Sequence, residues 1–122
     1  MDARILVVDD AKFARGLVVR ALEHGGYTDV FQAASAEDAI RIFREREPDL
    51  VLLDITLPDR NDLSLLSDLL AIRPGARIVM NSAIGQELII ADALELGAKD
   101  FITKPFDEQD LLAVVASVLS EE

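Results

Sequence analysis

The chain has 122 residues, of which 51% are hydrophobic, and its 12 lysines and arginines against 23 aspartates and glutamates give a formal net charge of −11. This length predicts one domain, and the negative charge argues against direct nucleic-acid binding, because two polyanions repel. Cysteine is absent, which excludes disulfides and thiolate metal sites and suits a cytoplasmic protein. The sequence shows no apolar run near the roughly 18 residues of a membrane span and no signal-peptide pattern in its first residues.

Five short β-rich segments alternate along the chain with amphipathic helical ones. Two of them are continuous apolar runs, residues 5–8 and 50–53, as is typical of strands buried on both faces of a parallel sheet. The expected strands are residues 4–8, 29–33, 50–53, 77–80 and 100–103.

Apolar residues at helical spacing predict five helices. The first ends at Gly25, the second begins at Ser35, which we expect to cap it, and the third ends before Pro74. The apolar positions of these three helices are Phe13, Leu17, Val18, Ala21 and Leu22; then Ala39, Ile40 and Phe43; then Leu65, Leu66, Leu69 and Leu70.

The fourth expected helix covers about residues 86–96, with Gly97 just past its end, and the fifth carries apolar residues from Leu111 to Leu119. In the fourth helix Leu88 falls between two acids, where we expect it to be exposed. The arc that we expect to face the sheet contains Ile89, Ile90, Ala93, Leu94 and Leu96. The strict alternation predicts a doubly wound α/β domain, a five-stranded parallel sheet with helices on both faces.

Polar residues follow four of the five expected strands, and ligands bind beyond the carboxyl ends of such strands. These residues are Asp9 and Asp10, then Asp54, then Asn81 and Ser82, then Lys104. A single acid after a strand is more often a turn residue or a helix cap. The convergence of three carboxylates, a hydroxyl and an ammonium group predicts a binding site instead.

The chemistry of this cluster indicates a metal ion and a phosphoryl group. Three adjacent carboxylates repel one another unless a cation neutralises them, and oxygen ligands without His or Cys select Mg²⁺ or Mn²⁺. A carboxylate such as Asp54 is a competent nucleophile toward phosphorus once a metal screens the repulsion. Lys104 and Ser82 would then hold the other phosphoryl oxygens.

At these residues the sequence resembles the response-regulator receiver family of two-component signalling, over essentially the whole chain. The segments that carry the resemblance are Val7-Val8-Asp9-Asp10, Leu53-Asp54-Ile55-Thr56-Leu57-Pro58, Asn81-Ser82-Ala83 and Phe101-Ile102-Thr103-Lys104-Pro105-Phe106. The resemblance implies a flavodoxin-like sheet with strand order 2-1-3-4-5 and five helices. Residues 82–86 and 97–101 look most like the stand-alone chemotaxis-type members.

The resemblance also implies roles for individual residues. Asp54 would be the phosphoacceptor, and it would share a metal ion with Asp9, Asp10 and the backbone carbonyl of Thr56. Lys104 would pair with the phosphoryl group.

Two further residues would act as the switch, the hydroxyl of Ser82 and the aromatic ring of Phe101, although a plain packing role for Phe101 is an equal alternative. In relatives the Lys104-Pro105 bond is cis. The sequence departs from the family at Asp62, where relatives usually carry glycine, and at Arg60, where many have methionine. The conformation of residues 59–62 is therefore an open question.

The expected function is a phosphoacceptor switch that catalyses its own phosphoryl transfer and slow autodephosphorylation. His24 has no apparent acidic partner in the sequence, so we expect the phosphoryl donor to be a histidine kinase and the output to be another protein. The resemblance implies that this partner binds the fourth helix, the fifth strand and the fifth helix. Three alternatives stay open: a domain of a longer regulator, a phosphate-inert interaction module, and a phosphohydrolase. The last would carry an acid in place of Thr56.

Overall fold

The computed structural model describes residues 3–60 and 62–121. Five strands form one parallel sheet in the order β2-β1-β3-β4-β5, as predicted, and five helices alternate with them. The strands are β1 (Arg4–Val8), β2 (Asp29–Ala33), β3 (Leu50–Asp54), β4 (Ile78–Ser82) and β5 (Asp100–Thr103). The helices are α1 (Lys12–His24), α2 (Ala36–Arg46), α3 (Ser64–Ile72), α4 (Glu87–Leu96) and α5 (Glu108–Leu119).

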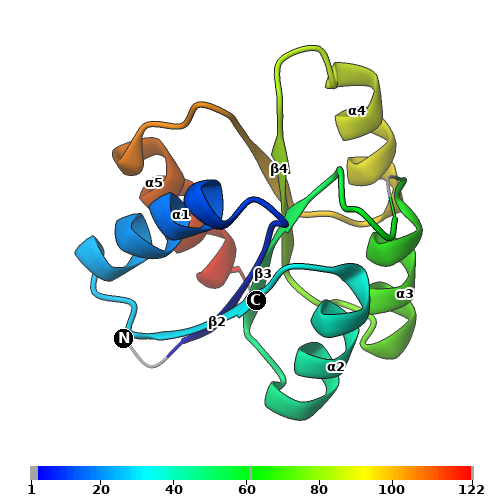
Figure 1. Ribbon diagram of the computed structural model, residues 1–122, viewed down its shortest axis with the longest axis horizontal. Coiled ribbons are helices and arrows are strands. Elements are labelled where there is room, and N and C mark those ends of the chain that lie inside the picture. The colour runs from blue at the N-terminus through cyan, green and yellow to red at the C-terminus, as the bar shows by residue number, and fades with distance from the viewer. Residues whose placement is uncertain (1–2, 61, 122) are drawn as a thin grey trace.

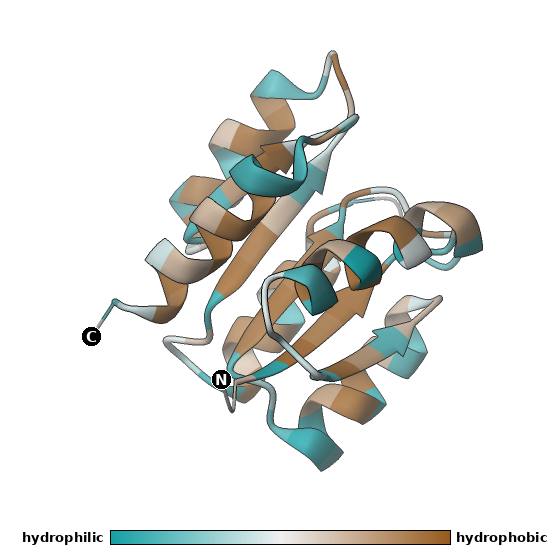
Figure 2. Cartoon of the chain, turned by 90° about the vertical axis from the view of Figure 1, so that its left-hand side faces the viewer, coloured by the Kyte–Doolittle hydropathy of each residue, from teal (hydrophilic) through white to brown (hydrophobic). Residues whose placement is uncertain are grey.

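The sheet is buried on both faces, which explains the continuous apolar runs in its strands. Helices α1 and α5 lie on one face, and α2, α3 and α4 lie on the other (Figure 1). In β1, for example, Ile5 and Val7 pack toward the first layer, while Leu6 and Val8 pack toward the second. Figure 2 shows the same arrangement as hydrophobic strands between helices whose outer surfaces are hydrophilic.

Predicted helix ends agree with the structure where the sequence contains a capping signal. The Ser35 hydroxyl accepts a hydrogen bond from the Asp38 N–H and caps α2. Helix α1 ends at Gly25, and α4 ends at Gly97, which has a positive φ of 127°. The predicted fourth strand, by contrast, is displaced: β4 begins at Ile78 and continues through Asn81 and Ser82, because their backbones pair with β5.

The prediction that a broad apolar arc of α4 faces the sheet is wrong in part. Ile90 and Ala93 are buried, whereas Ile89, Leu94 and Leu96 are 36%, 39% and 49% exposed. The buried pair lies about 60° apart on the helix, so the sheet accepts a narrower stripe than the sequence offers. Leu88 is exposed, as predicted.

Among the described residues, none of the helices is long and apolar enough to cross a membrane.

Candidate functional site

The carboxyl ends of β1 and β3 bring three acidic side chains together. The two strands are hydrogen-bonded neighbours with Val8 opposite Leu53, so Asp9 and Asp10 leave the sheet beside Asp54. One carboxylate oxygen from each of these three residues lies within 4.8 Å of the others. The structure therefore assembles the predicted acid cluster.

Asp9 is the most tightly held of the three acids. Its side chain is 1% exposed. One carboxylate oxygen accepts a hydrogen bond from the Ala11 N–H at 2.9 Å, and the other accepts one from Lys104 Nζ at 3.1 Å. Asp10, in contrast, is exposed, and its side chain makes no hydrogen bond to another described residue.

Lys104 joins two of the acids, since its Nζ atom also lies 3.2 Å from Asp54 Oδ2. Burial alone would lower the pKa of Lys104, but the nearby charges of Asp54 and Asp9 outweigh it, so this pKa lies above its ordinary value. Burial raises the pKa of Asp54, and Asp9 raises it further, against the opposing attraction of Lys104. By formal charge, three carboxylates around one ammonium group leave the cluster negative.

The all-oxygen donor set suits a hard divalent cation. Three carboxylates that lie this close, one of them with a raised pKa, match the coordination that Mg²⁺ takes from one or two acids together with phosphate oxygens and waters. Thr56, whose backbone carbonyl was predicted to be a further ligand, lies two residues after Asp54 and is exposed. Its backbone nitrogen is 3.5 Å from Asp54 Oδ1.

Ser82 lies at the same edge of the sheet, because Asn81, the residue before it, pairs with Asp54. Its side chain is buried, and its hydroxyl donates a long hydrogen bond of 3.4 Å to the carbonyl of Ile102. Phe101 is 41% exposed, so it is not a core packing residue. A cavity of about 160 Å³ between α4 and β5 is lined by both Ser82 and Phe101.

The loop after β3 has a conformation that needs no glycine at Asp62. The Asp59 carboxylate accepts hydrogen bonds from the N–H groups of Ala36 and Glu37 at the start of α2. Asp62 accepts from the Ser64 N–H at 2.9 Å, and Arg60 pairs with Asp68 of α3. Hydrogen bonds and an ion pair from side chains therefore fix the described part of this loop. Asn61, which belongs to the segment 59–62 in which the sequence differs from the family, lies outside the described residues.

Two other predictions concern backbone geometry and His24. The Lys104-Pro105 peptide bond is cis, as predicted. The expectation that His24 lacks an acidic partner is wrong: its Nδ1 lies 2.9 Å from Glu108 Oε1 of α5, far away in sequence. Because α1 begins beside the acid cluster and rises about 1.5 Å per residue, His24 lies at the helix end remote from Asp54.

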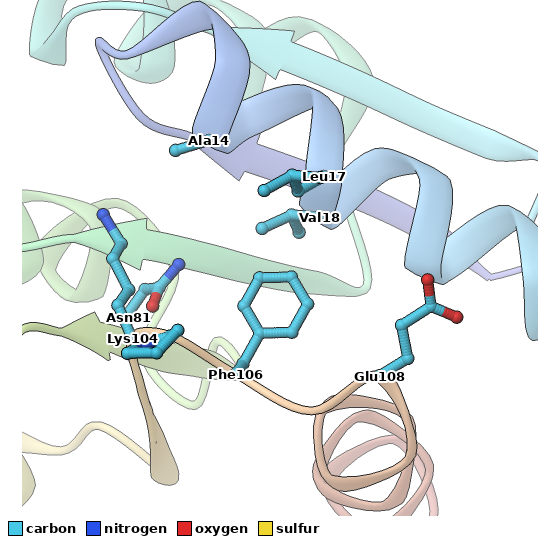
Figure 3. Close-up of a pocket in the computed structure, with 8 residues that line it drawn as sticks. Ala14, Leu17, Val18, Asn81, Lys104, Phe106 and Glu108 are labelled. Atoms are coloured by element: carbon cyan, nitrogen blue, oxygen red, sulfur yellow. The ribbon is translucent and has the colours of Figure 1, made fainter.

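A second cavity, of about 320 Å³, lies between α1 and the β5–α5 connection. In Figure 3, Leu17 and Val18 line it from α1, and Phe106 points toward them from the connection. Asn81 lines the same cavity and is 95% buried, yet its Oδ1 atom has no hydrogen-bond partner among the described residues. The sequence placed Asn81 at a strand end, but a buried, unsatisfied amide is visible only in three dimensions.

Comparison with known proteins gives the class that this fold and site define. The model of the response regulator receiver domain matches residues 5–116. The chain therefore belongs to the response-regulator receiver family, whose members are phosphoacceptor switches of two-component signalling.

Two kinds of similar protein match this chain over most of its length, curated relatives and a solved receiver domain. Protein CcdB of Bacillus subtilis is 44% identical over 95% of this chain and 97% of its own. Chemotaxis protein CheY is 39% identical in Bacillus subtilis, over 98% of this chain and all of its own, and 35% identical in Thermotoga maritima, over 97% and 98%. The NtrX receiver domain from Brucella abortus superimposes with a TM-score of 0.92 at 35% identity, covering 97% of this chain and 99% of that domain.

Proposed function

We propose that Asp54 is the phosphoacceptor of this receiver and that residues 1–122 act as one signalling unit. The observation that carries the proposal is the assembly of Asp9, Asp10 and Asp54 within 4.8 Å, with Lys104 between two of them. Asp54 is partly accessible, whereas Asp9 is almost fully buried. An incoming phosphoryl group would therefore meet Asp54 before Asp9.

A divalent cation would be held by the carboxylates of Asp9, Asp10 and Asp54 and by the carbonyl of Thr56. When bound, Mg²⁺ or Mn²⁺ supplies positive charge that offsets the repulsion between the acids and an anionic phosphoryl donor. The raised pKa of Asp54, caused mainly by burial and also by the charge of Asp9, supports this assignment, because a nearby cation would stabilise the ionised carboxylate.

In the transfer step, a carboxylate oxygen of Asp54 forms a bond to phosphorus while the bond from phosphorus to the donor histidine nitrogen breaks. The imidazole leaves with the electron pair and takes up a proton. Lys104 Nζ, 3.2 Å from Asp54 Oδ2, is placed to hold a phosphoryl oxygen. In autodephosphorylation, water attacks phosphorus and the Asp54 carboxylate leaves.

The switch would use Ser82 and Phe101. The Ser82 hydroxyl makes one long bond to Ile102, so a phosphoryl oxygen on Asp54 offers it a stronger, charged acceptor. Ser82→Ala should accept phosphate but respond less to it in amide chemical shifts on addition of beryllofluoride, a phosphoryl mimic. An undiminished response would remove Ser82 from the switch.

Intact mass after incubation with acetyl phosphate tests the phosphoacceptor assignment. Wild type with Mg²⁺ should gain one phosphoryl group, and EDTA or Asp54→Asn should prevent the gain. Asp49→Asn, which changes an exposed acid at the opposite end of β3, is the matched control and should behave as wild type. Labelling of Asp54→Asn at the wild-type rate would refute the proposal.

We place the output surface on α4, β5 and α5. Large apolar side chains are exposed there, Leu88 on α4 and Phe101 on β5, and Ile84 is exposed in the loop just before α4. The charge of this part of the chain is one-sided, since residues 78–122 contain nine acidic and two basic residues. A partner with a basic, partly apolar segment suits this surface, and its binding should weaken with salt.

Peptides selected from a displayed library on the beryllofluoride-loaded protein would test this surface. The selected peptides should be basic and should bind Leu88→Ala several-fold more weakly, by roughly 1 kcal/mol. Phe13→Ala, which removes an equally exposed apolar side chain from α1, is the control and should bind them normally. Equal binding by Leu88→Ala would remove Leu88 from the surface.

The cytoplasmic location stays a prediction, supported by the lack of cysteine.

A further inference from the structure

Arg15, on the first turns of α1, connects the loop after β1 to the edge strand β2. Its Nη1 donates a hydrogen bond to the backbone carbonyl of Asp9 at 2.6 Å, and its Nε donates to Gln32 Oε1 at 2.9 Å. The side chain is partly buried, unlike those of Lys12 and Phe13 nearby. The guanidinium thus spans two elements, and the phosphoryl chemistry described above gives it no role.

The bond to Asp9 acts on the backbone that leads into Asp10. The Asp9 N–H is already fixed by the carbonyl of Ala33 at 3.0 Å, and the Asp9 carbonyl is fixed by Arg15. Asp10 is exposed, and its side chain has no hydrogen bond to another described residue. Its carboxylate is therefore placed mainly by its backbone, and Arg15 holds the peptide group immediately before it.

We propose that Arg15 is a positioning residue: by holding the Asp9 carbonyl against the edge of β2, it orients Asp10 toward the cation that the three acids share. The inference rests on the proposed function, because it assumes a divalent cation at that cluster. Residues that orient metal ligands without touching the metal commonly change metal affinity by 10–100-fold. The planar fork of arginine bonds both acceptors in a fixed geometry, which the flexible ammonium group of a lysine does not provide.

The charge of Arg15 and its positioning role should change the Mg²⁺ affinity in opposite directions. Arg15 is a positive charge close to an acid cluster, so by charge alone it opposes the binding of a cation. If charge were its main effect, Arg15→Ala would bind Mg²⁺ more tightly. A positioning role requires the opposite result, weaker binding, because Asp10 loses its fixed orientation.

Mg²⁺ titrations followed by amide chemical shifts, at constant ionic strength, would separate the two effects. Arg15→Ala should raise the Mg²⁺ Kd roughly tenfold, and Arg15→Lys should recover part of that loss while keeping the charge. Arg20→Ala, which removes an exposed arginine five residues further along α1, is the control and should leave Kd within about twofold of wild type. Failure of wild type itself to bind Mg²⁺ would defeat the proposed function rather than the role of Arg15.

A metal-free readout supports the same test. In EDTA, the Ala11 N–H, which donates to Asp9 Oδ1, should exchange with solvent faster in Arg15→Ala than in wild type. Gln32→Ala, which removes one acceptor of the fork and leaves α1 intact, should raise Kd by less than Arg15→Ala does but clearly beyond the range of the Arg20→Ala control. It replaces Arg15→Ala if that variant does not fold. Unchanged or tighter Mg²⁺ binding by a folded Arg15→Ala, or an equal loss in Arg20→Ala, would overturn the proposal.

Discussion

The two ends of the sheet use charged residues in opposite ways. At the amino end, two charged side chains bond to backbone groups: the Asp49 carboxylate accepts from the Arg4 N–H, and the Arg73 guanidinium donates to the carbonyl of Pro48 and lies over the Phe43 ring. At the carboxyl end, Asp9, Asp10 and Asp54 crowd around one ammonium group. The bonds at the amino end stabilise the fold, whereas the crowded acids at the carboxyl end repel one another.

This difference explains how a small domain carries a switch. Repulsion at the carboxyl end lowers the stability of the metal-free state, and a cation or a phosphoryl group changes that balance where it binds. Since the strands beneath are buried and well packed, the fold tolerates the cost. We therefore expect the effects of mutating the three acids or Lys104 at the carboxyl end to depend on Mg²⁺, and the effects of mutations at the amino end to be independent of it.

The largest contrast should be between Lys104→Ala and Arg73→Ala. Removing Lys104 leaves the buried carboxylate of Asp9 without its ammonium partner. The free energy of unfolding in EDTA should therefore fall by about 2 kcal/mol, and Mg²⁺ should recover part of this loss. Arg73→Ala should cost about 1 kcal/mol whether or not Mg²⁺ is present. Chemical denaturation in EDTA and in Mg²⁺ measures both. Equal Mg²⁺ dependence of the two variants would end the contrast between the two ends of the sheet.

A second pair compares an acid from each end. Asp10→Asn should raise the melting temperature in EDTA by about 4 °C, since it removes repulsion worth about 1 kcal/mol, and it should reduce the stabilisation by Mg²⁺. Asp49→Asn, whose side chain accepts from the Arg4 N–H, should lower the melting temperature and leave the Mg²⁺ effect unchanged. If Asp10→Asn is less stable in EDTA and keeps the full Mg²⁺ effect, Asp10 is a structural residue.

Asn81 is another residue at the carboxyl end whose environment in the fold is unfavourable. Its buried Oδ1 has no partner among the described residues, so Asn81→Val should stabilise the protein by about 1 kcal/mol. The Mg²⁺ stabilisation should not change, because Asn81 is not one of the three acids. Thermal unfolding in EDTA and in Mg²⁺ decides; a loss of stability would show that the amide of Asn81 has a partner in solution.

The smallest effect should be on the pH dependence of stability. The pKa of Asp54 is raised in the folded protein, so the folded state keeps a proton that the unfolded chain releases, and stability in EDTA falls as pH rises from about 3.9 through the folded pKa. Asp54→Asn should lack this fall. The pKa of Lys104 is also raised, so its contribution is present below about pH 10.4 and is lost as pH rises through the folded value. Identical profiles of wild type and Asp54→Asn would contradict the raised pKa of Asp54.

The sequence predicted the features that follow from local pattern. Alternating apolar segments predicted a parallel sheet between two helical layers, and the resemblance to the receiver family implied its strand order. The residues after the strands predicted Asp9, Asp10, Asp54 and Lys104 at the site, because parallel strands end at one edge of a sheet. The cap at Ser35 was also predictable, since a capping residue acts on its own helix.

The features that were missed depend on contacts between distant segments. Asp59 bonds to the start of α2, His24 pairs with Glu108, and Arg15 reaches Gln32. No periodic pattern encodes these partners. The exposed flanks of α4 were misjudged for a related reason: hydrophobic spacing gives the apolar face of a helix, but the neighbouring elements decide how much of it is buried.

Asp54 should be the residue that carries the phosphoryl group. Borohydride reduction of the phosphorylated protein converts an aspartyl phosphate into homoserine, which peptide mapping by mass spectrometry locates in the sequence. This assignment predicts homoserine at position 54 in wild type treated with acetyl phosphate and Mg²⁺, and none when EDTA replaces Mg²⁺. Homoserine at position 9 or 10, or a phosphorylated protein without any reducible aspartate, would contradict it.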